Sequence, residues 1–67
     1  MKKEQQVLIE WLKENYTEES DPIGVISFVG KQHMKSAVIQ ATMTLSSAEQ
    51  AQAIQQFITF VLEREAE

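Results

Sequence analysis

Two segments, one near each end of the chain, combine helical periodicity with wide apolar faces, and this feature constrains the fold most. At 100° per residue, six apolar residues of the segment 3–16 fall in an arc of about 200°, namely Val7, Leu8, Ile9, Trp11, Leu12 and Tyr16. The segment 47–65 has an apolar arc of similar width, formed by Ala51, Ala53, Ile54, Phe57, Ile58, Phe60, Val61 and Leu62. Ser46 and Glu49 precede this second arc at the spacing of a capping box. The sequence therefore predicts two amphipathic helices, each with a broader apolar face than a helix needs to lie on a sheet.

Between these two segments the sequence favours extended structure. Residues 23–29 are rich in β-branched and aromatic side chains and lie between Pro22 and Gly30. Residues 34–45 follow an alternating pattern that places one set of side chains on a single face, namely Ala37, Ile39, Ala41, Met43 and Leu45. The connection from Gly30 to His33 is short enough only for a hairpin. We therefore predict one small α+β domain of two layers and order α-β-β-α, with both helices on one face of an antiparallel β-hairpin.

The predicted hairpin is too narrow to cover both helices. The chain has 67 residues and no cysteine, so disulfides cannot add stability. A domain of about 60 residues buries only about 60% of the surface that its unfolded chain exposes. Two strands also leave two open edges, so the surplus apolar surface favours a homodimer whose edge pairing extends the sheet to four strands. The alternative is a tight monomer in which the helices cover each other's excess.

The net charge of −4 is unevenly distributed along the chain. Residues 22–48 contain two lysines and no acid, whereas the segments on either side are acidic. An acidic chain offers few contacts to a phosphate backbone, which argues against nucleic acid as a partner. Two other interpretations remain open. One is a DNA or RNA contact through the Lys31–Lys35 hairpin; the other is an acidic nucleic-acid mimic of the kind that mobile elements encode, using Glu10, Glu14, Glu18, Glu19 and Asp21.

The residues that could carry catalysis do not form a recognisable site. Gly24 and Gly30 are separated by five residues, and glutamine follows Lys31, so the segment does not fit a phosphate-binding loop. His33 has lysines as its charged neighbours in the sequence, which disfavours a bound cation. The carboxylates lie on predicted solvated faces and do not pair for acid–base work. We therefore expect no catalytic residues, no cofactor and no metal, and we do not expect an enzyme.

The remaining expectations concern location and function. The apolar segment after the N-terminus is interrupted by Glu10 and Lys13, so it does not resemble a secretion signal, and no run approaches the ~20 apolar residues of a membrane helix. We expect a cytoplasmic protein without membrane contact. We interpret the chain as a small non-catalytic protein-interaction module that acts as an adaptor, regulator or inhibitor of a larger protein and also forms a homodimer. Aromatic residues are common at binding hot spots, and the predicted contact residues are Trp11, Tyr16, Val25, Val29 and Val38.

Overall fold

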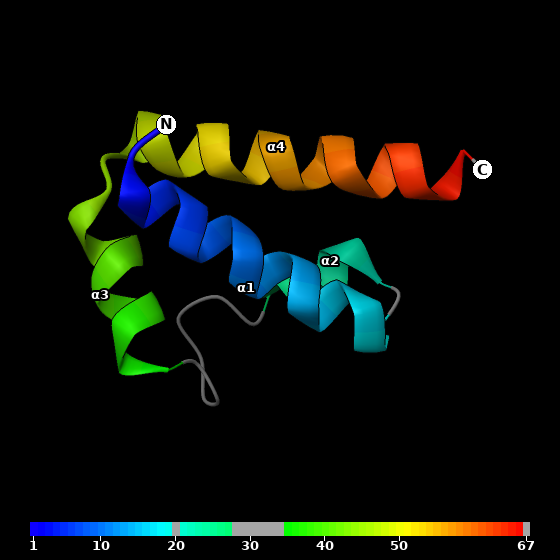
Figure 1. Ribbon diagram of the computed structural model, residues 1–67, viewed down its shortest axis with the longest axis horizontal. Helices are drawn as coiled ribbons and strands as arrows, with labels where there is room; N and C mark the ends of the chain where they lie inside the picture. Colours follow the sequence, from blue (N-terminus) through cyan, green and yellow to red (C-terminus); the bar gives the residue numbers. More distant parts are fainter. Residues whose placement is uncertain (20, 28–34, 67) are drawn as a thin grey trace.

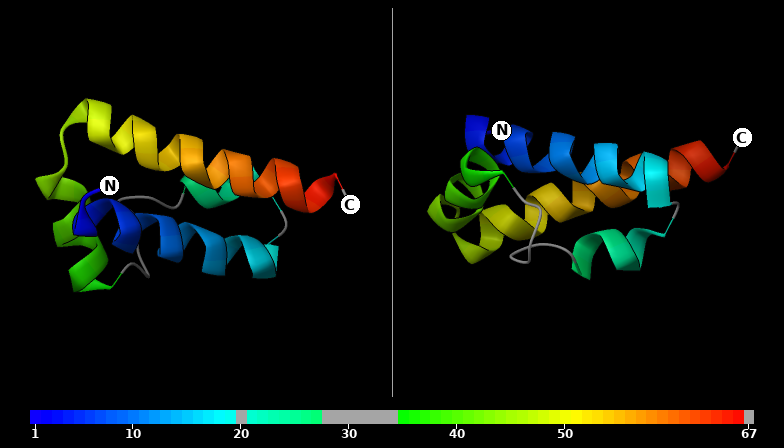
Figure 2. Two further views of the ribbon diagram at one scale, coloured as in Figure 1. Left: turned by 45° about the horizontal axis from the view of Figure 1, so that its top comes forward. Right: turned by 90° about the horizontal axis from the view of Figure 1, so that it is seen from below.

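The protein folds as a set of helices arranged around one central helix. The structure, a computed structural model, describes residues 1–19, 21–27 and 35–66, and within these ranges its elements are α1 (Lys3–Glu19), α2 (Pro22–Ser27), α3 (Ser36–Thr44) and α4 (Ser47–Glu65). The long helices α1 and α4 lie side by side and run in the same direction (Figure 1). α3 crosses the N-terminal end of this pair, and α2 lies near its C-terminal half (Figure 2). α1 contacts all three other helices.

The central position of α1 accounts for its wide apolar arc. A helix with one neighbour buries one stripe of side chains, whereas α1 packs against three neighbours. Trp11 and Tyr16, on opposite flanks of the arc, are therefore both buried. The core joins buried residues from every helix, namely Leu8, Ile9, Trp11, Leu12, Tyr16, Val25, Val38, Leu45, Ala53, Phe57 and Val61. Much of the apolar surface that the sequence presents as a surplus is thus covered within the chain.

Polar contacts fasten α1 to α4 at both ends of the pair. Near the N-termini, Gln5 is only 2% exposed, and its amide donates hydrogen bonds to the Glu49 carbonyl oxygen at 2.9 Å and to Gln52 Oε1 at 3.0 Å. Near the C-termini, the Tyr16 hydroxyl donates to the Glu65 carboxylate, and the Tyr16 ring meets Phe57 edge to face at a centroid distance of 6.0 Å. These contacts fix the parallel orientation of the two helices.

The junction between α3 and α4 is short and is held by the cap of α4. Ser46 is the N-cap of α4, and the predicted capping box is confirmed. Ser46 Oγ accepts from the Glu49 backbone N–H at 3.2 Å, and Glu49 Oε1 accepts from the Ser46 backbone N–H at 2.9 Å. Gln50, one residue further along α4, donates its side-chain amide to the carbonyl oxygens of Thr42 and Leu45. The end of α3 therefore finds part of its hydrogen bonding on the next helix, which fixes the angle between them.

The segment 34–45, predicted to be a strand, is helical in its described part. α3 spans Ser36–Thr44, and Val38, Ala41 and Leu45 form its buried face. These residues lie at i, i+3 and i+7, a helical spacing that coexists in this segment with the alternation at i, i+2 and i+4. The β-branched Thr42 also fits a helix, because its hydroxyl donates to the Val38 carbonyl oxygen at 2.9 Å. Periodicity supported both interpretations, and packing against α1 selected the helical one.

The predicted strand 23–29 is also wrong for the residues that the structure describes. α2 begins at Pro22, a residue favoured in the first turn because its fixed φ suits a helix and it needs no N–H there. The Asp21 carbonyl oxygen accepts from the Val25 backbone N–H at 2.9 Å, closing the first turn. The fold class is therefore not α+β: residues 1–19, 21–27 and 35–66 contain no strand, and the predicted four-stranded dimer sheet has no hairpin from which to extend. Residues 28–34, which include Val29, Lys31 and His33, lie outside the described residues.

Candidate protein-interaction surface

The residues that the sequence suggested as partner contacts lie in the core. Trp11, Tyr16, Val25 and Val38 are all buried by other parts of the same chain, and Val29 is not described. Their apolar area is already covered, so they hold the helices together and leave little surface for a partner. A binding surface must therefore be sought among the exposed side chains.

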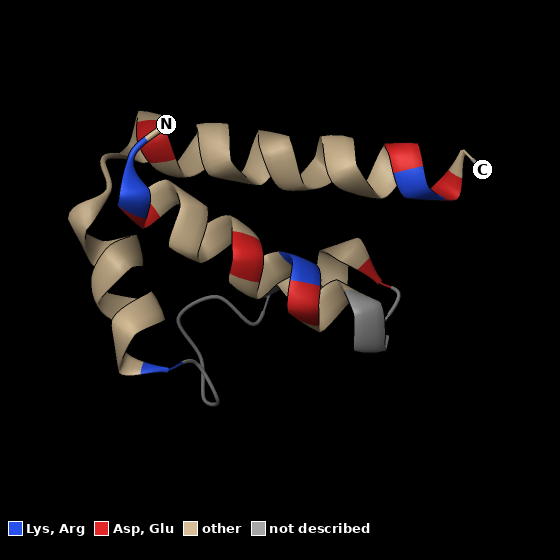
Figure 3. Ribbon diagram, viewed as in Figure 1, with Lys and Arg blue, Asp and Glu red and all other residues tan. Residues whose placement is uncertain are grey.

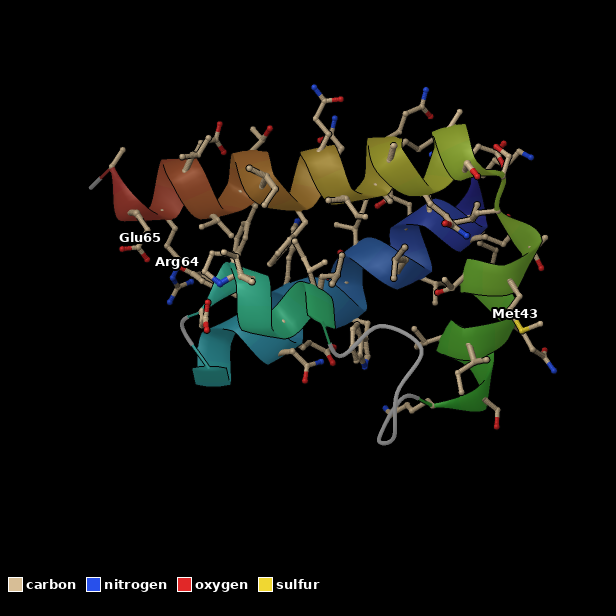
Figure 4. The ribbon with its side chains drawn as sticks, turned by 180° about the vertical axis from the view of Figure 1, so that it is seen from behind. Met43, Arg64 and Glu65 are labelled. Atoms are coloured by element: carbon tan, nitrogen blue, oxygen red, sulfur yellow. The ribbon has the colours of Figure 1, made fainter. Side chains whose placement is uncertain are left out.

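The outer face of α3 is exposed and carries no charge. We define it by Ser36, Ala37, Ile39, Gln40, Met43 and Thr44, all of which are exposed. Met43 is 78% exposed and Ile39, one turn before it, is 37% exposed. Figure 3 shows α3 without a charged residue from end to end, with Lys35 just before it. In Figure 4, Met43 points away from the helical core. A half-exposed helix of a globular protein ordinarily presents charged and polar residues to water, so this face departs from the usual pattern.

A shallow groove borders the outer face of α3 on the side of α1. It has a volume of about 290 Å³, and its lining residues are Lys3, Glu4, Ala37, Gln40, Ala41 and Thr44. Two alanines belong to α3 and leave room between that helix and the first turn of α1. The outer face of α3 thus has a ridge, formed by Ile39 and Met43, beside a hollow that contains Ala37.

The other large exposed apolar residues either lie among charges or, like Ile23 on α2, have no exposed apolar neighbour on the same helix. Leu62 is 64% exposed, but Glu63, Arg64 and Glu65 follow it directly on α4. Figure 4 shows Arg64 and Glu65 at this end of the helix, far from Met43. Ile23 and Met1 are exposed near Asp21 and Lys2, respectively. Among the large exposed apolar residues of the described chain, only Ile39 and Met43 share an uncharged helical face.

The acidic residues singled out in the sequence lie on a different part of the molecule. Glu10 and Glu14 are exposed one turn apart on α1, and Asp21 is exposed just before α2. Figure 3 shows acidic residues along α1, away from α3. Glu18 and Glu19 belong to the last turn of α1, and their side chains lie outside the described residues. The predicted contact at Lys31–Lys35 falls mostly on residues outside the described ranges. The strands predicted on either side of it are helical in their described parts, and Lys35 is exposed at the N-cap of α3.

Among the residues that the structure describes, two interhelical pairs account for the ionisable groups whose pKa is shifted. Lys2 Nζ lies 2.6 Å from Glu49 Oε2, and this contact raises the pKa of Lys2 and lowers that of Glu49, to which the Ser46 backbone N–H also donates. The hydrogen bond to Glu65 raises the pKa of the Tyr16 hydroxyl, since the neutral phenol is the donor. Each pair joins α1 or its N-terminal extension to α4. These shifts therefore accompany helix packing.

The described residues show neither a cluster suited to a metal ion nor a helix suited to a membrane. Within residues 1–19, 21–27 and 35–66, no three His, Cys, Asp or Glu side chains are grouped so that they could hold a metal ion. None of the described helices has the length and apolar character needed to cross a membrane.

Sequence reasoning missed the outer face of α3 because it assigned this segment to a covered strand. The signal was present, since the segment 22–48 is the part of the chain without acidic residues. Comparison with known proteins adds no assignment: no family model, no curated protein and no solved structure matches the chain.

Proposed function

We propose that the protein is a cytoplasmic, non-catalytic protein-interaction module that binds through the outer face of α3. The observation that carries this proposal is the exposure of Met43 and Ile39 on a helix that contains no charged residue. Exposed apolar area without charge is what the central part of a protein–protein interface requires, because charged groups are costly to desolvate there. A partner for this face is expected to present an uncharged surface of its own.

Four ionisable side chains at the ends of the long helices have a structural use. Glu49 and Lys2 connect the N-terminal ends of the long helices, and Tyr16 and Glu65 connect the C-terminal ends. A catalytic acid or base is kept available for a substrate proton, whereas these groups are occupied by one another. This arrangement supports a binding role over a catalytic one.

The test is site-specific photo-crosslinking in the cell that produces the protein. A photoreactive amino acid replaces Met43 in one variant and Gln55, an exposed residue of α4, in the control. We expect protein adducts from position 43 in clear excess over those from position 55. Equal yields from the two positions, or none from either, would overturn the proposal. Adducts heavier than twice the chain would identify a different protein as partner, and adducts of twice the chain a second copy.

The acidic-mimic alternative is favoured by one observation, the exposed pair Glu10 and Glu14 on α1. It predicts binding that weakens steeply as salt is raised, because its contacts would be ionic. Binding through the outer face of α3 is expected to change little with salt. Measuring the yield of adducts from position 43 and from a photoreactive residue at position 14, at low and high ionic strength, separates the two functions.

A further inference from the structure

We infer that a second copy of this chain occupies the outer face of α3, with the two α3 helices antiparallel about a two-fold axis near Gln40. This inference rests on the proposed function, since it names the partner for the same surface. Its first support is charge. Each copy carries a net charge of −4, so two copies repel each other over most orientations. Contact through α3 brings together helices that contain no acidic residue.

The second support is the match of shapes along the helix. In an antiparallel pair about a two-fold axis, residues at equal distances on either side of the axis face each other across the interface. With the axis at Gln40, Met43 of one copy faces Ala37 of the other, and Ser36 faces Thr44. The largest exposed side chain of the face would then enter the hollow beside the alanine. The same contact occurs twice, so Met43 and the hollow beside Ala37 are both used in each copy.

The third support comes from the border of the groove. Lys3 and Glu4 line the hollow from the first turn of α1. They supply one cation and one anion per copy, so a symmetric pair gathers no net charge there. At the centre, the two Gln40 side chains are exposed in the single chain and carry both donors and acceptors. A self-pairing of amides at a two-fold axis satisfies both without introducing charge.

The size of the face sets the expected strength. A nine-residue helix is about 14 Å long and about 10 Å wide. Such a contact falls below the ~800 Å² per partner of a standard stable interface. We therefore expect a weak dimer, populated at protein concentrations between about 10 μM and about 1 mM.

Single-cysteine variants test the arrangement cleanly, because the chain has no cysteine of its own. Gln40→Cys places a thiol at the proposed axis, and Gln55→Cys places one on the exposed side of α4 as a control. Under mild oxidation at equal concentration, we expect the covalent dimer of Gln40→Cys to form at least ten times faster than that of Gln55→Cys. Equal rates would overturn the inference. Circular dichroism of the reduced variants verifies that both are folded.

A mixing experiment tests the direction of the two helices. In the antiparallel pair, position 37 lies opposite position 43, whereas 37 and its own copy are about 9 Å apart along the axis. A disulfide needs Cα atoms within about 7 Å. An equal mixture of Ala37→Cys and Met43→Cys should therefore form mixed disulfides faster than either variant forms its own. Faster crosslinking within each single variant would indicate parallel helices and contradict the inference.

Sedimentation velocity over the same concentration range tests the interface without a crosslink. Met43→Glu should weaken self-association at least tenfold, because it introduces an acidic side chain into each half of the contact, and Gln55→Glu should leave it unchanged. A wild-type chain that stays monomeric at about 1 mM would refute the second copy as occupant. If position 43 then still crosslinks to a different protein, the proposed function stands; if it crosslinks to nothing, both fail.

Discussion

α3 and α4 are adjacent in the chain but are built in different ways. α4 has 19 residues, a capping box at its start and a row of polar side chains toward water. α3 has nine residues, and its N-cap residue, Lys35, makes no side-chain hydrogen bond to the first turn. Its outer face carries Ile39 and Met43. The comparison shows that α4 has local features that favour a helix on its own. α3 depends on packing against α1, and part of its apolar surface stays exposed after that packing.

The largest expected effect concerns the core between α1 and α4. Phe57 is fully buried and meets Tyr16 edge to face, so Phe57→Ala should lower the free energy of unfolding by about 3–5 kcal/mol. The matched change on α3, Val38→Ala, removes a smaller buried side chain and should cost about 2 kcal/mol. Urea unfolding followed by circular dichroism measures both. If Val38→Ala lowered the free energy of unfolding more than Phe57→Ala, the buried face of α3 would contribute more to stability than that of α4, contrary to this expectation.

A smaller effect is expected at the polar contact near the N-termini. Gln5→Ala removes the buried amide that donates to the Glu49 carbonyl oxygen and to Gln52, and it should cost about 1–3 kcal/mol because both part-buried acceptors lose their donor. Gln6, the next residue, is exposed, and Gln6→Ala serves as the control with a change within about 0.5 kcal/mol. Equal losses would show that the interhelical amide contributes nothing specific.

Two substitutions at the N-caps of α4 and α3 should change the stability of the fold in opposite directions. Ser46→Ala removes the N-cap of α4 and should destabilise the fold by about 1 kcal/mol. Lys35→Ser introduces a capping side chain at a residue whose backbone already has the extended geometry of an N-cap, and it should stabilise by about 0.5–1 kcal/mol. Thermal unfolding in parallel measures both variants. If Lys35→Ser is no more stable than the wild-type chain, the missing cap does not limit the stability of α3.

The smallest effect is the pH dependence of the pair that joins Lys2 to Glu49. Because the folded state lowers the pKa of Glu49, the stabilisation from its carboxylate is complete above about pH 4.5, the ordinary value. It is lost as the pH falls through the lower pKa of the folded state. The melting temperature should therefore decline in acid, and less so in Glu49→Gln. If the melting temperature of Glu49→Gln falls in acid as steeply as that of the wild-type chain, other carboxylates dominate the acid dependence. Glu63→Gln, an exposed control, should show the wild-type decline.

At alkaline pH, stability should depend on the contact between Tyr16 and Glu65 near the C-terminal ends of α1 and α4. The raised pKa of Tyr16 means that the unfolded chain loses its phenolic proton first. The stabilisation from the Tyr16–Glu65 hydrogen bond is thus present below about pH 10, the ordinary value for tyrosine, and declines above it. Tyr16→Phe should remove this component, as melting curves across the alkaline range would show.

The candidate surface illustrates what sequence reasoning can and cannot locate. The absence of acid in the segment 22–48 was visible in the sequence, but it did not indicate which side chains of the segment would be exposed. Trp11 and Tyr16 have the composition of binding residues, but three neighbouring helices bury α1 from both flanks. Whether an apolar residue belongs to a core or to a surface depends on how many elements surround its helix, and composition does not report that number.

The two long helices, α1 and α4, could be predicted from the amino acids alone, because long apolar periodicity and the Ser46–Glu49 capping box act within one segment. The sequence did not determine the middle of the chain, where short apolar runs fit a strand and a helix equally well. The packed fold was needed to show that α2 and α3 are helices, that α1 lies at the centre, and that Met43 faces outward. The physical reason is that short segments gain too little from local interactions to select a conformation, so the surface against which they pack selects it for them.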